Sequence, residues 1–201
     1  TLDLRSWGPT VIESPPGSLC VVDDFWFRYV CDMGIAGPDR GQGGKYLFLP
    51  PGYDGEVPDG YFTYRPPTYA NWVVLRALGG LPDMMKTRIY PLAEADDPTP
   101  NEWIDLTKWA VNTVHANDFS FYEEVDELVQ SEPIEALDPE RTGQLAAIGI
   151  VKGEPFAPDE RMRRILEQAA VIGAAISRTI SYAPRDPEAM LYGSWKNLFV
   201  G

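Results

Sequence analysis

The chain has a single histidine and two cysteines, which excludes most metal and redox chemistry. A structural zinc site uses four Cys or His ligands at short spacings, and neither a CxxC pair nor a Cys/His cluster is present. We therefore expect neither a metal nor a cofactor. Cys20 and Cys31 could form a disulfide in an oxidising compartment, but two cysteines in a chain of this size are more often small buried hydrophobes.

Basic residues are also scarce, because 17 Lys and Arg stand against 30 Asp and Glu, a net charge of −13. Such a field repels phosphate backbones and anionic membrane surfaces. Nucleic acid is therefore not an expected partner, whereas a cation or a neutral ligand is easier to accommodate. No apolar run reaches the ~20 residues that a membrane-spanning helix needs, and no signal-peptide pattern is present.

The sequence motifs of common enzyme families are missing as well. The chain has no GxSxG nucleophile elbow, no HExxH zinc motif and no GxGxxG dinucleotide loop. Its glycine-rich stretch at Gly41–Gly44 lacks the Lys-Ser/Thr pair of a phosphate-binding loop and is typical of a turn. These absences leave no recognised catalytic constellation.

The first half of the chain consists of short apolar runs separated by Pro/Gly turns. The clearest runs are Lys45–Leu49, Tyr61–Arg65 and Ala70–Leu78, with Pro-Pro-Gly and Pro-Asp-Gly between the first two. Further strands are expected at Thr1–Leu4, Pro9–Glu13, Leu19–Val22, Phe25–Met33 and Arg88–Leu92. The pattern predicts an antiparallel β-sandwich over residues 1–92, followed by an acidic, Pro-rich linker at 93–102.

The second half has the pattern of helices. Ser120 and Glu123 form a capping box that predicts a helix at Phe121–Gln130, and Asp138-Pro139 predicts the start of a second helix that ends at Gly149. Pro158 begins a third, long helix with 3.6-residue apolar spacing. Its apolar positions are Met162, Ile165, Leu166, Ala169, Ile172, Gly173, Ile176 and Ile180. We therefore predict an α+β protein in which a small all-helical domain of about three helices occupies residues 103–185.

Both ends of the sequence are apolar. Thr1–Leu4 resembles the middle of a strand, and Trp195–Gly201 is aromatic and apolar, whereas natural chain ends are usually polar. We expect a piece of a longer polypeptide, in which residues 186–201 lead to a further domain. That domain, a second chain or a homo-oligomer would then cover the ends.

Four residues are the candidates for catalysis: His115, Asp118, Asp24 and Arg28. His115 could be a general base oriented by Asp118, and Asp24 with Arg28 could bind a cation or an activated water. The alternative for His115 is a loop histidine that satisfies backbone groups near a helix start, with Asp118 capping that helix. The alternative for Asp24 is a turn or bulge at a strand, because adjacent strand residues point to opposite faces and Asp23 and Asp24 would not converge.

The candidates for ligand binding are Tyr46, Tyr64 and Trp72, which belong to a run of aromatic residues in the predicted sheet. Aromatic rings can form a platform for sugars or other flat apolar ligands. Alternating aromatic residues in strands are also common in the core of a sandwich, and that alternative stays open.

Four strings resemble one family: Val22–Arg28 (VDDFWFR), Gly43–Tyr53 (GGKYLFLPPGY), His115–Tyr122 (HANDFSFY) and Gly153–Asp159 (GEPFAPD). Together they are similar to the DUF1254/DUF1214 family of bacterial proteins, whose function is largely unassigned. The resemblance implies an N-terminally incomplete DUF1254 β-sandwich, then a helical domain, with the jelly-roll-like DUF1214 domain absent from this sequence. It also implies a periplasmic or cell-envelope location, and it supplies no catalytic residues.

Two functions remain open at this stage. The first is a structural or ligand-binding module of an envelope protein, favoured by the missing catalytic constellation and the apolar ends. The second is a hydrolase-type enzyme with a cleft between the two domains, which requires that the four catalytic candidates converge within hydrogen-bond reach.

Overall fold

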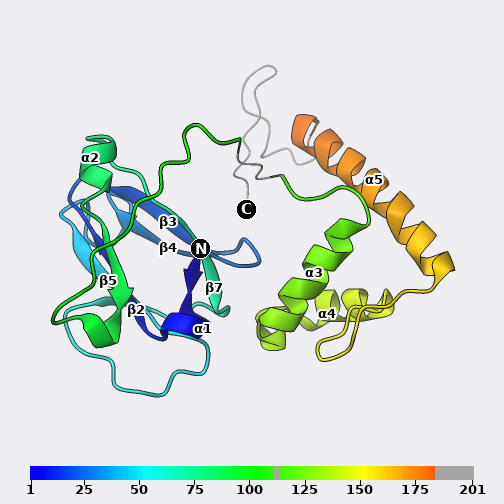
Figure 1. The fold of residues 1–201 in the computed structure, drawn as a ribbon, viewed down its shortest axis with the longest axis horizontal. Helices are drawn as coiled ribbons and strands as arrows, with labels where there is room; N and C mark the ends of the chain where they lie inside the picture. The colour runs from blue at the N-terminus through cyan, green and yellow to red at the C-terminus, as the bar shows by residue number, and fades with distance from the viewer. Residues whose placement is uncertain (111–113, 184–201) are drawn as a thin grey trace. The chain divides into compact units, whose positions relative to one another are not determined.

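The computed structural model describes residues 1–110 and 114–183 (Figure 1). The chain divides into two compact units. The first comprises Thr1–Val111 and Ser131–Asp138, and the second comprises the described residues within Asn112–Gln130 and Pro139–Gly201.

Two four-stranded sheets form the first unit. Strands β1 (Leu2–Asp3), β7 (Ala70–Val74), β3 (Leu19–Asp24) and β4 (Tyr29–Gly34) make one sheet, in that spatial order. Strands β6 (Phe62–Tyr64), β5 (Gly44–Phe48), β2 (Thr10–Ser14) and β8 (Arg88–Pro91) make the other. All pairs are antiparallel except β5 with β6, which run parallel. The predicted α+β class and the sandwich are therefore confirmed, with one mixed sheet.

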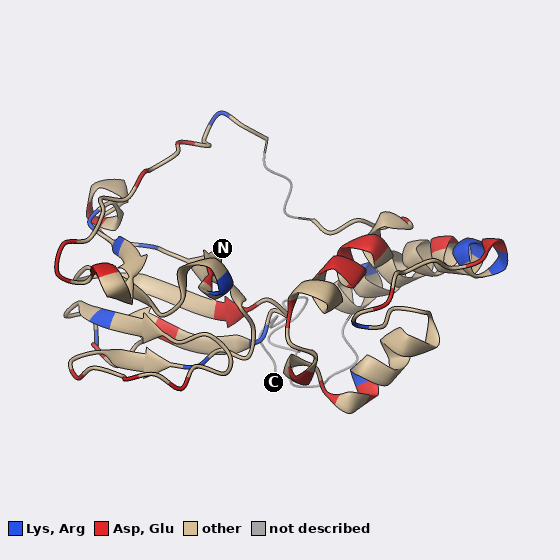
Figure 2. Ribbon diagram, turned by 60° about the horizontal axis from the view of Figure 1, so that its bottom comes forward, with Lys and Arg blue, Asp and Glu red and all other residues tan. Residues whose placement is uncertain are grey.

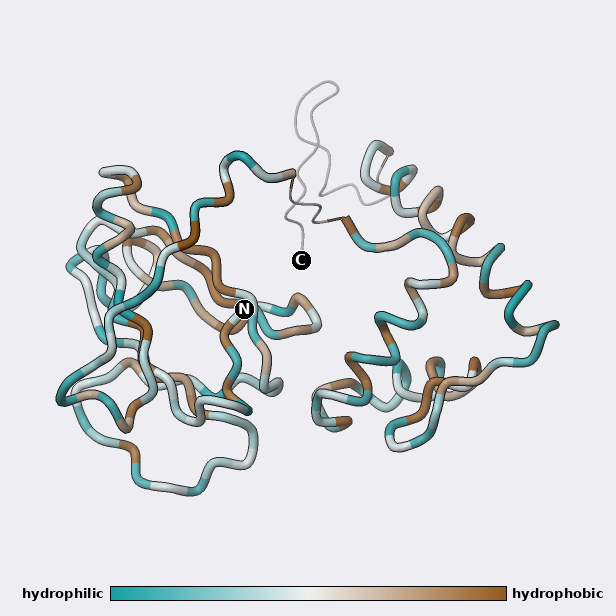
Figure 3. Tube along the Cα trace, viewed as in Figure 1, coloured by the Kyte–Doolittle hydropathy of each residue, from teal (hydrophilic) through white to brown (hydrophobic). Residues whose placement is uncertain are grey.

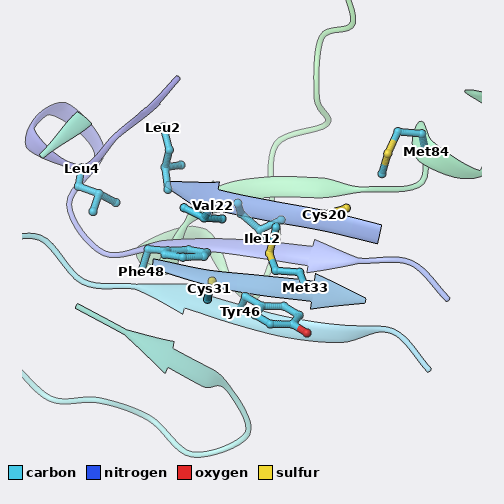
Figure 4. Packing of buried hydrophobic residues seen from close by; sticks show 10 residues of the cluster. All are labelled: Leu2, Leu4, Ile12, Cys20, Val22, Cys31, Met33, Tyr46, Phe48 and Met84. Carbon is cyan, nitrogen blue, oxygen red and sulfur yellow. The ribbon is translucent and has the colours of Figure 1, made fainter. Parts of the chain in front are cut away.

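The sandwich core lies between the two sheets and follows the two-residue period of the strands. In the first sheet Val22, Cys31 and Met33 point inward, and in the second Ile12 and Phe48 do (Figure 4). Cys20 and Cys31 are buried free thiols, and burial raises the pKa of the Cys31 thiol to about 12.

Three of the predicted strands differ from the observed ones. The single strand expected at Phe25–Met33 is wrong, because β3 runs to Asp24, a turn follows, and β4 begins at Tyr29. The strand expected at Thr1–Leu4 stops at Asp3, whose carboxylate accepts the N–H groups of Arg5 and Ser6 and caps the helical turn α1 (Leu4–Trp7). The Ala70–Leu78 run is a strand only as far as Val74.

Short helical elements complete the first unit: α2 (Leu81–Met84), the 3-10 turn η1 (Leu92–Glu94) and the 3-10 turn η2 (Ile134–Ala136). The segment 131–138 is fixed to β7 by the buried Glu132. Its Oε2 accepts the N–H of Tyr69 at 2.6 Å and its Oε1 accepts that of Ala70 at 3.0 Å.

The second unit contains α3 (Ser120–Ser131), α4 (Pro139–Ala147) and α5 (Glu160–Tyr182), close to the predicted helices. Gln130 at the end of α3 fixes the loop before α5: its Oε1 accepts the N–H of Gly153 at 2.7 Å and its Nε2 donates to Val151 O at 2.9 Å. Hydrophobic residues recur along α5 (Figure 3), yet only Leu166 and Ala170 of this helix are buried. The sequence pattern located the helix correctly but not the extent of its burial.

Candidate functional site

Asp24 and Arg28 lie together and build the β3–β4 turn. Asp24 is buried, and its Oδ1 accepts the N–H groups of Trp26 at 2.8 Å and Arg28 at 2.9 Å. Its Oδ2 accepts from Arg28 Nε at 2.8 Å and pairs with Nη2 at 2.7 Å. With all these donors directed at one carboxylate, the pair explains why the chain turns here, which favours the turn alternative that the sequence left open.

His115 and Asp118 lie in the second unit, just before α3. The imidazole Nδ1 of His115 lies 2.8 Å from Ala116 O, and its ring meets Phe121 edge-on at 5.6 Å between centroids. Asp118 Oδ1 accepts the N–H of Ser120 at 2.9 Å and its hydroxyl at 2.6 Å. These hydrogen bonds lower the pKa of Asp118 and give it the role of a cap at the helix start. The convergence of this pair with Asp24 and Arg28 stays a prediction.

Tyr46, Tyr64 and Trp72 do not form one platform. Tyr46 on β5 is fully buried, and its hydroxyl donates to Asp39 Oδ1 at 2.6 Å. Burial and this hydrogen bond raise the pKa of Tyr46. Tyr64 on β6 is half-buried and stacks on Phe48 at 5.9 Å. These two rings pack in the sandwich, while Trp72 lies on the other sheet, opposite Asp23, and is 40% exposed.

A cavity of about 350 Å³ opens at one side of the sandwich. Its lining includes Val73 within β7, Leu75 directly after β7, and Ile89 of β8, and all three also pack against the main core. Trp7 of α1 and Trp103 also line the cavity, and both residues are partly exposed. The cavity is therefore a mostly apolar entrance into the space between the sheets.

The segment after η1 closes one wall of this cavity because Asn101 binds it to β8. Asn101 Oδ1 accepts the N–H of Ile89 at 3.1 Å, and Nδ2 donates to Thr87 O at 3.2 Å. Glu102 is an exposed charged side chain of the lining, and Thr1, which carries the α-amino group of the chain, also lines the cavity. With one negative and one positive group on a largely apolar lining, the cavity suits a neutral ligand.

Sequence reasoning missed this cavity. Trp7 and Trp103 both lie outside the strands and helices predicted from the sequence. A large apolar ring in such a segment needs a packing partner, but Trp109 has the same property without lining the cavity, so this signal does not single out the two residues. The pairing of β7 with β1, which places Trp7 beside β7, has no signature in local sequence.

A second hollow of about 220 Å³ lies in the second unit beside His115. Phe121 and Tyr122 of α3 line one side, and small residues of α5 line the other: Ala169, Ala170, Gly173, Ala174 and Ser177. The small side chains explain the hollow, because they leave space that larger residues would fill.

Within residues 1–110 and 114–183, no group of three or more His, Cys, Asp or Glu side chains is arranged to hold a metal ion. Over the same described residues, no helix has the length and apolar character needed to cross a bilayer.

Residues 1–96 match the family model described as a protein of unknown function, DUF1254. Among solved structures, the VPA0106 protein from Vibrio parahaemolyticus is similar, with a TM-score of 0.59 and 15% sequence identity. The match covers 93% of this chain and 48% of that one, so the chain spans about half the length of this structural relative. At this identity the similarity shows the fold alone. No curated protein matches the chain.

Proposed function

We propose that the chain is a non-catalytic binding module whose sandwich takes a small, neutral and largely apolar molecule. The observation that carries the proposal is the cavity lined by residues of β7 and β8, by two tryptophans, and by the oppositely charged Glu102 side chain and Thr1 α-amino group. Its volume of about 350 Å³ lies at the lower end of the range for ligand pockets. The roles of Asp24, Arg28 and Asp118 in turns and caps also support a binding rather than a catalytic module.

The test is a fluorescence titration with N-phenyl-1-naphthylamine, a neutral apolar probe. Leu75→Trp enlarges a side chain of the cavity lining, so probe binding should fall at least about tenfold, the loss expected when a ~1.4 kcal/mol contact is removed. The matched control is Val74→Trp, because the adjacent β7 residue points away from the cavity. Equal binding by wild type and Leu75→Trp, or equal loss in both variants, contradicts the proposal.

A second pair of variants covers the case that Leu75→Trp fails to fold. Trp103→Ala removes an aromatic wall and should weaken probe binding, whereas Trp109→Ala removes an exposed indole that does not line the cavity. If both substitutions leave the affinity unchanged, the cavity does not bind the probe.

The module is also proposed to work beside a partner, either a further domain of the same polypeptide or another copy, in the cell envelope. Support for a partner comes from the solved relative, of which this chain covers 48%, and from the exposed isoleucines of α5, Ile172, Ile176 and Ile180. Support for the envelope is the family resemblance alone. Light scattering of the purified chain, with Ile176→Glu as the variant, tests whether α5 mediates self-association.

A further inference from the structure

The outer face of the β7–β3–β4 sheet carries apolar side chains that remain exposed among the described residues of its own unit. Residues alternate along the strands, so Cys20 and Val22 point into the core while Val21 and Asp23 point outward. Val21 pairs with Val74, and Asp23 pairs with Trp72, across β3 and β7. Val74 is 42% exposed and Trp72 is 40% exposed.

The β3–β4 turn adds aromatic rings to one end of this face. Phe25 stacks on Trp72 at 6.1 Å between ring centroids, and Phe27 lies tilted against the same indole at 5.4 Å. Phe27 nevertheless remains 71% exposed, and Tyr29 is 67% exposed. We call Phe25, Phe27, Tyr29, Trp72, Asp23 and Asp32 the aromatic–acidic corner.

The corner is held in a conformation that costs energy. Phe27 has φ +59°, in the left-handed region that a bulky residue rarely adopts. The Asp24 carboxylate maintains it through the N–H groups on either side, at Trp26 and Arg28. Strained backbone that exposes a large apolar ring is common where a surface binds something.

The carboxylates of the corner lack positive partners. Among the described residues, no Lys or Arg lies within ion-pair distance of Asp23 or Asp32. Arg28 is engaged by Asp24, and Arg76 lies two residues beyond Val74 on β7's continuation. Burial and the charges of Asp24 and Asp32 raise the pKa of Asp23, which indicates an excess of negative charge at this place.

We propose that the aromatic–acidic corner and the adjoining sheet face dock a polypeptide segment in which lysine or arginine alternates with apolar residues. Asp32 Oδ2 accepts the hydroxyl of Tyr29 at 3.2 Å, but no ion pair of the described residues includes Asp32 or Asp23. Charge complementarity therefore selects the basic groups, since each would lie between carboxylates without a basic partner and aromatic ring faces, the arrangement of cation–π recognition. The exposed valine and tryptophan of β7 select the apolar residues. A second copy of the chain is a less suitable occupant of this particular face, because its 30 acidic residues outnumber its 17 basic ones and it would bring mostly further negative charge to the corner. Acidic residues, red in Figure 2, occur throughout both units, so the aromatic rings rather than charge alone distinguish this face.

The experiment is isothermal titration calorimetry with an eight-residue peptide of alternating lysine and valine, and a glutamate–valine peptide of the same length. The lysine peptide should bind, with affinity falling as salt increases, and the glutamate peptide should not. Asp23→Asn with Asp32→Asn should weaken binding at least about tenfold. Asp96→Asn with Asp97→Asn, two exposed residues after η1, is the matched control because it removes the same charge, and it should change affinity less than about twofold.

A second pair of variants tests the contribution of the aromatic rings to peptide binding. Trp72→Ala should weaken lysine-peptide binding, and Trp109→Ala should not. Equal loss for both aspartate pairs, or an unchanged affinity in Trp72→Ala, overturns the proposal because binding would then follow net charge alone. Self-association of the wild type that disappears in Trp72→Ala overturns it as well, since the occupant would then be a second copy.

Discussion

The outer faces of the two sheets differ in how far their apolar side chains are buried. On the β6–β5–β2–β8 sheet, Val11, Leu47, Leu49 and Tyr90 form a second buried cluster. The chain's own loops cover it, through the partly buried Tyr53, Tyr61, Leu92 and Ala95. On the β7–β3–β4 sheet no such cluster exists among the described residues, and apolar side chains remain exposed.

The carboxylates of the two faces differ in the same way. Glu13 on β2 pairs with Lys45 Nζ at 3.3 Å and Arg88 Nη1 at 3.6 Å, and accepts the Tyr90 hydroxyl at 2.5 Å. Although burial raises its pKa, the hydrogen bonds from Tyr90 and Lys45 outweigh this and the pKa is lowered. Burial, together with the like charges of Asp24 and Asp32, raises the pKa of Asp23, and no ion pair offsets them among the described residues. One face is therefore complete in both packing and charge, and the other is incomplete in both.

The largest expected effect tests the difference in packing. Leu47→Ala should lower the free energy of unfolding by about 3 kcal/mol, because a fully buried leucine leaves a cavity under the covering loop. Val74→Ala, on the exposed face, should change it by less than about 0.5 kcal/mol. Urea denaturation followed by tryptophan fluorescence measures both. Similar losses in the two variants would mean that the two faces are equally packed.

The second-largest effect is expected from a substitution that disturbs the β7–β3–β4 sheet and leaves the β6–β5–β2–β8 sheet unchanged. Asp24→Asn should cost about 2 kcal/mol, because the turn loses its charged acceptor and Arg28 loses its partner; the partial exposure of Arg28 keeps the cost below that of a fully buried pair. Amide chemical shifts should move at Phe27 and Trp72 and stay constant at Leu47. Shifts of equal size at Leu47 would show that the turn is coupled to the whole sandwich.

The contrast between the two faces also shows what sequence reasoning can reach. The runs at Lys45–Leu49 and Pro9–Glu13 are short apolar segments bounded by Pro, Gly and Ser turns, so these strands were predicted close to their observed bounds. The Phe25–Met33 run alternates more clearly, yet it contains a turn, because one carboxylate at Asp24 binds backbone groups two and four residues later. Alternation reports on side-chain burial and carries no information about such a side-chain-to-backbone bond.

The candidate site residues could be predicted from the sequence only where residues near them in the sequence determine the position of the side chain. That Asp23 and Asp24 point to opposite faces follows from the strand period, and Asp118 as a cap follows from its position before a helix. The cavity depends on which strands become neighbours, and so does the pairing of Asp23 with Trp72. Strand order is set by the whole chain, so a single sequence without homologues does not reveal these sites.

A smaller difference in stability is expected between variants of the Glu13 and Asp23 carboxylates. Glu13→Gln should lower stability by about 1 kcal/mol at neutral pH, since it removes a charged acceptor from Tyr90 and weakens two partly exposed ion pairs. Asp23→Asn should leave stability unchanged or raise it by up to about 0.5 kcal/mol, because it removes a repulsive charge. Chemical denaturation at pH 7 checks both signs. A loss in Asp23→Asn equal to that in Glu13→Gln would show that Asp23 has a stabilising partner after all.

The smallest effect is the pH dependence of these two differences. Glu13 has a lowered pKa in the folded state, so its contribution is fully present above its ordinary value of 4.5 and is lost as pH falls through the folded pKa. The deficit of Glu13→Gln should therefore shrink in acid. Asp23 has a raised pKa, so its ionisation costs stability, and the cost develops as pH rises from 3.8 through the folded pKa. The gain of Asp23→Asn should therefore grow over that window and then stay constant. Denaturation curves between pH 3 and pH 7 measure how each stability difference changes with pH. Changes of the same sign in the two variants would mean that the charge environments of the two faces do not differ. A saturating amount of the lysine–valine peptide should abolish the pH dependence for Asp23→Asn alone, because a bound cation replaces the missing positive partner.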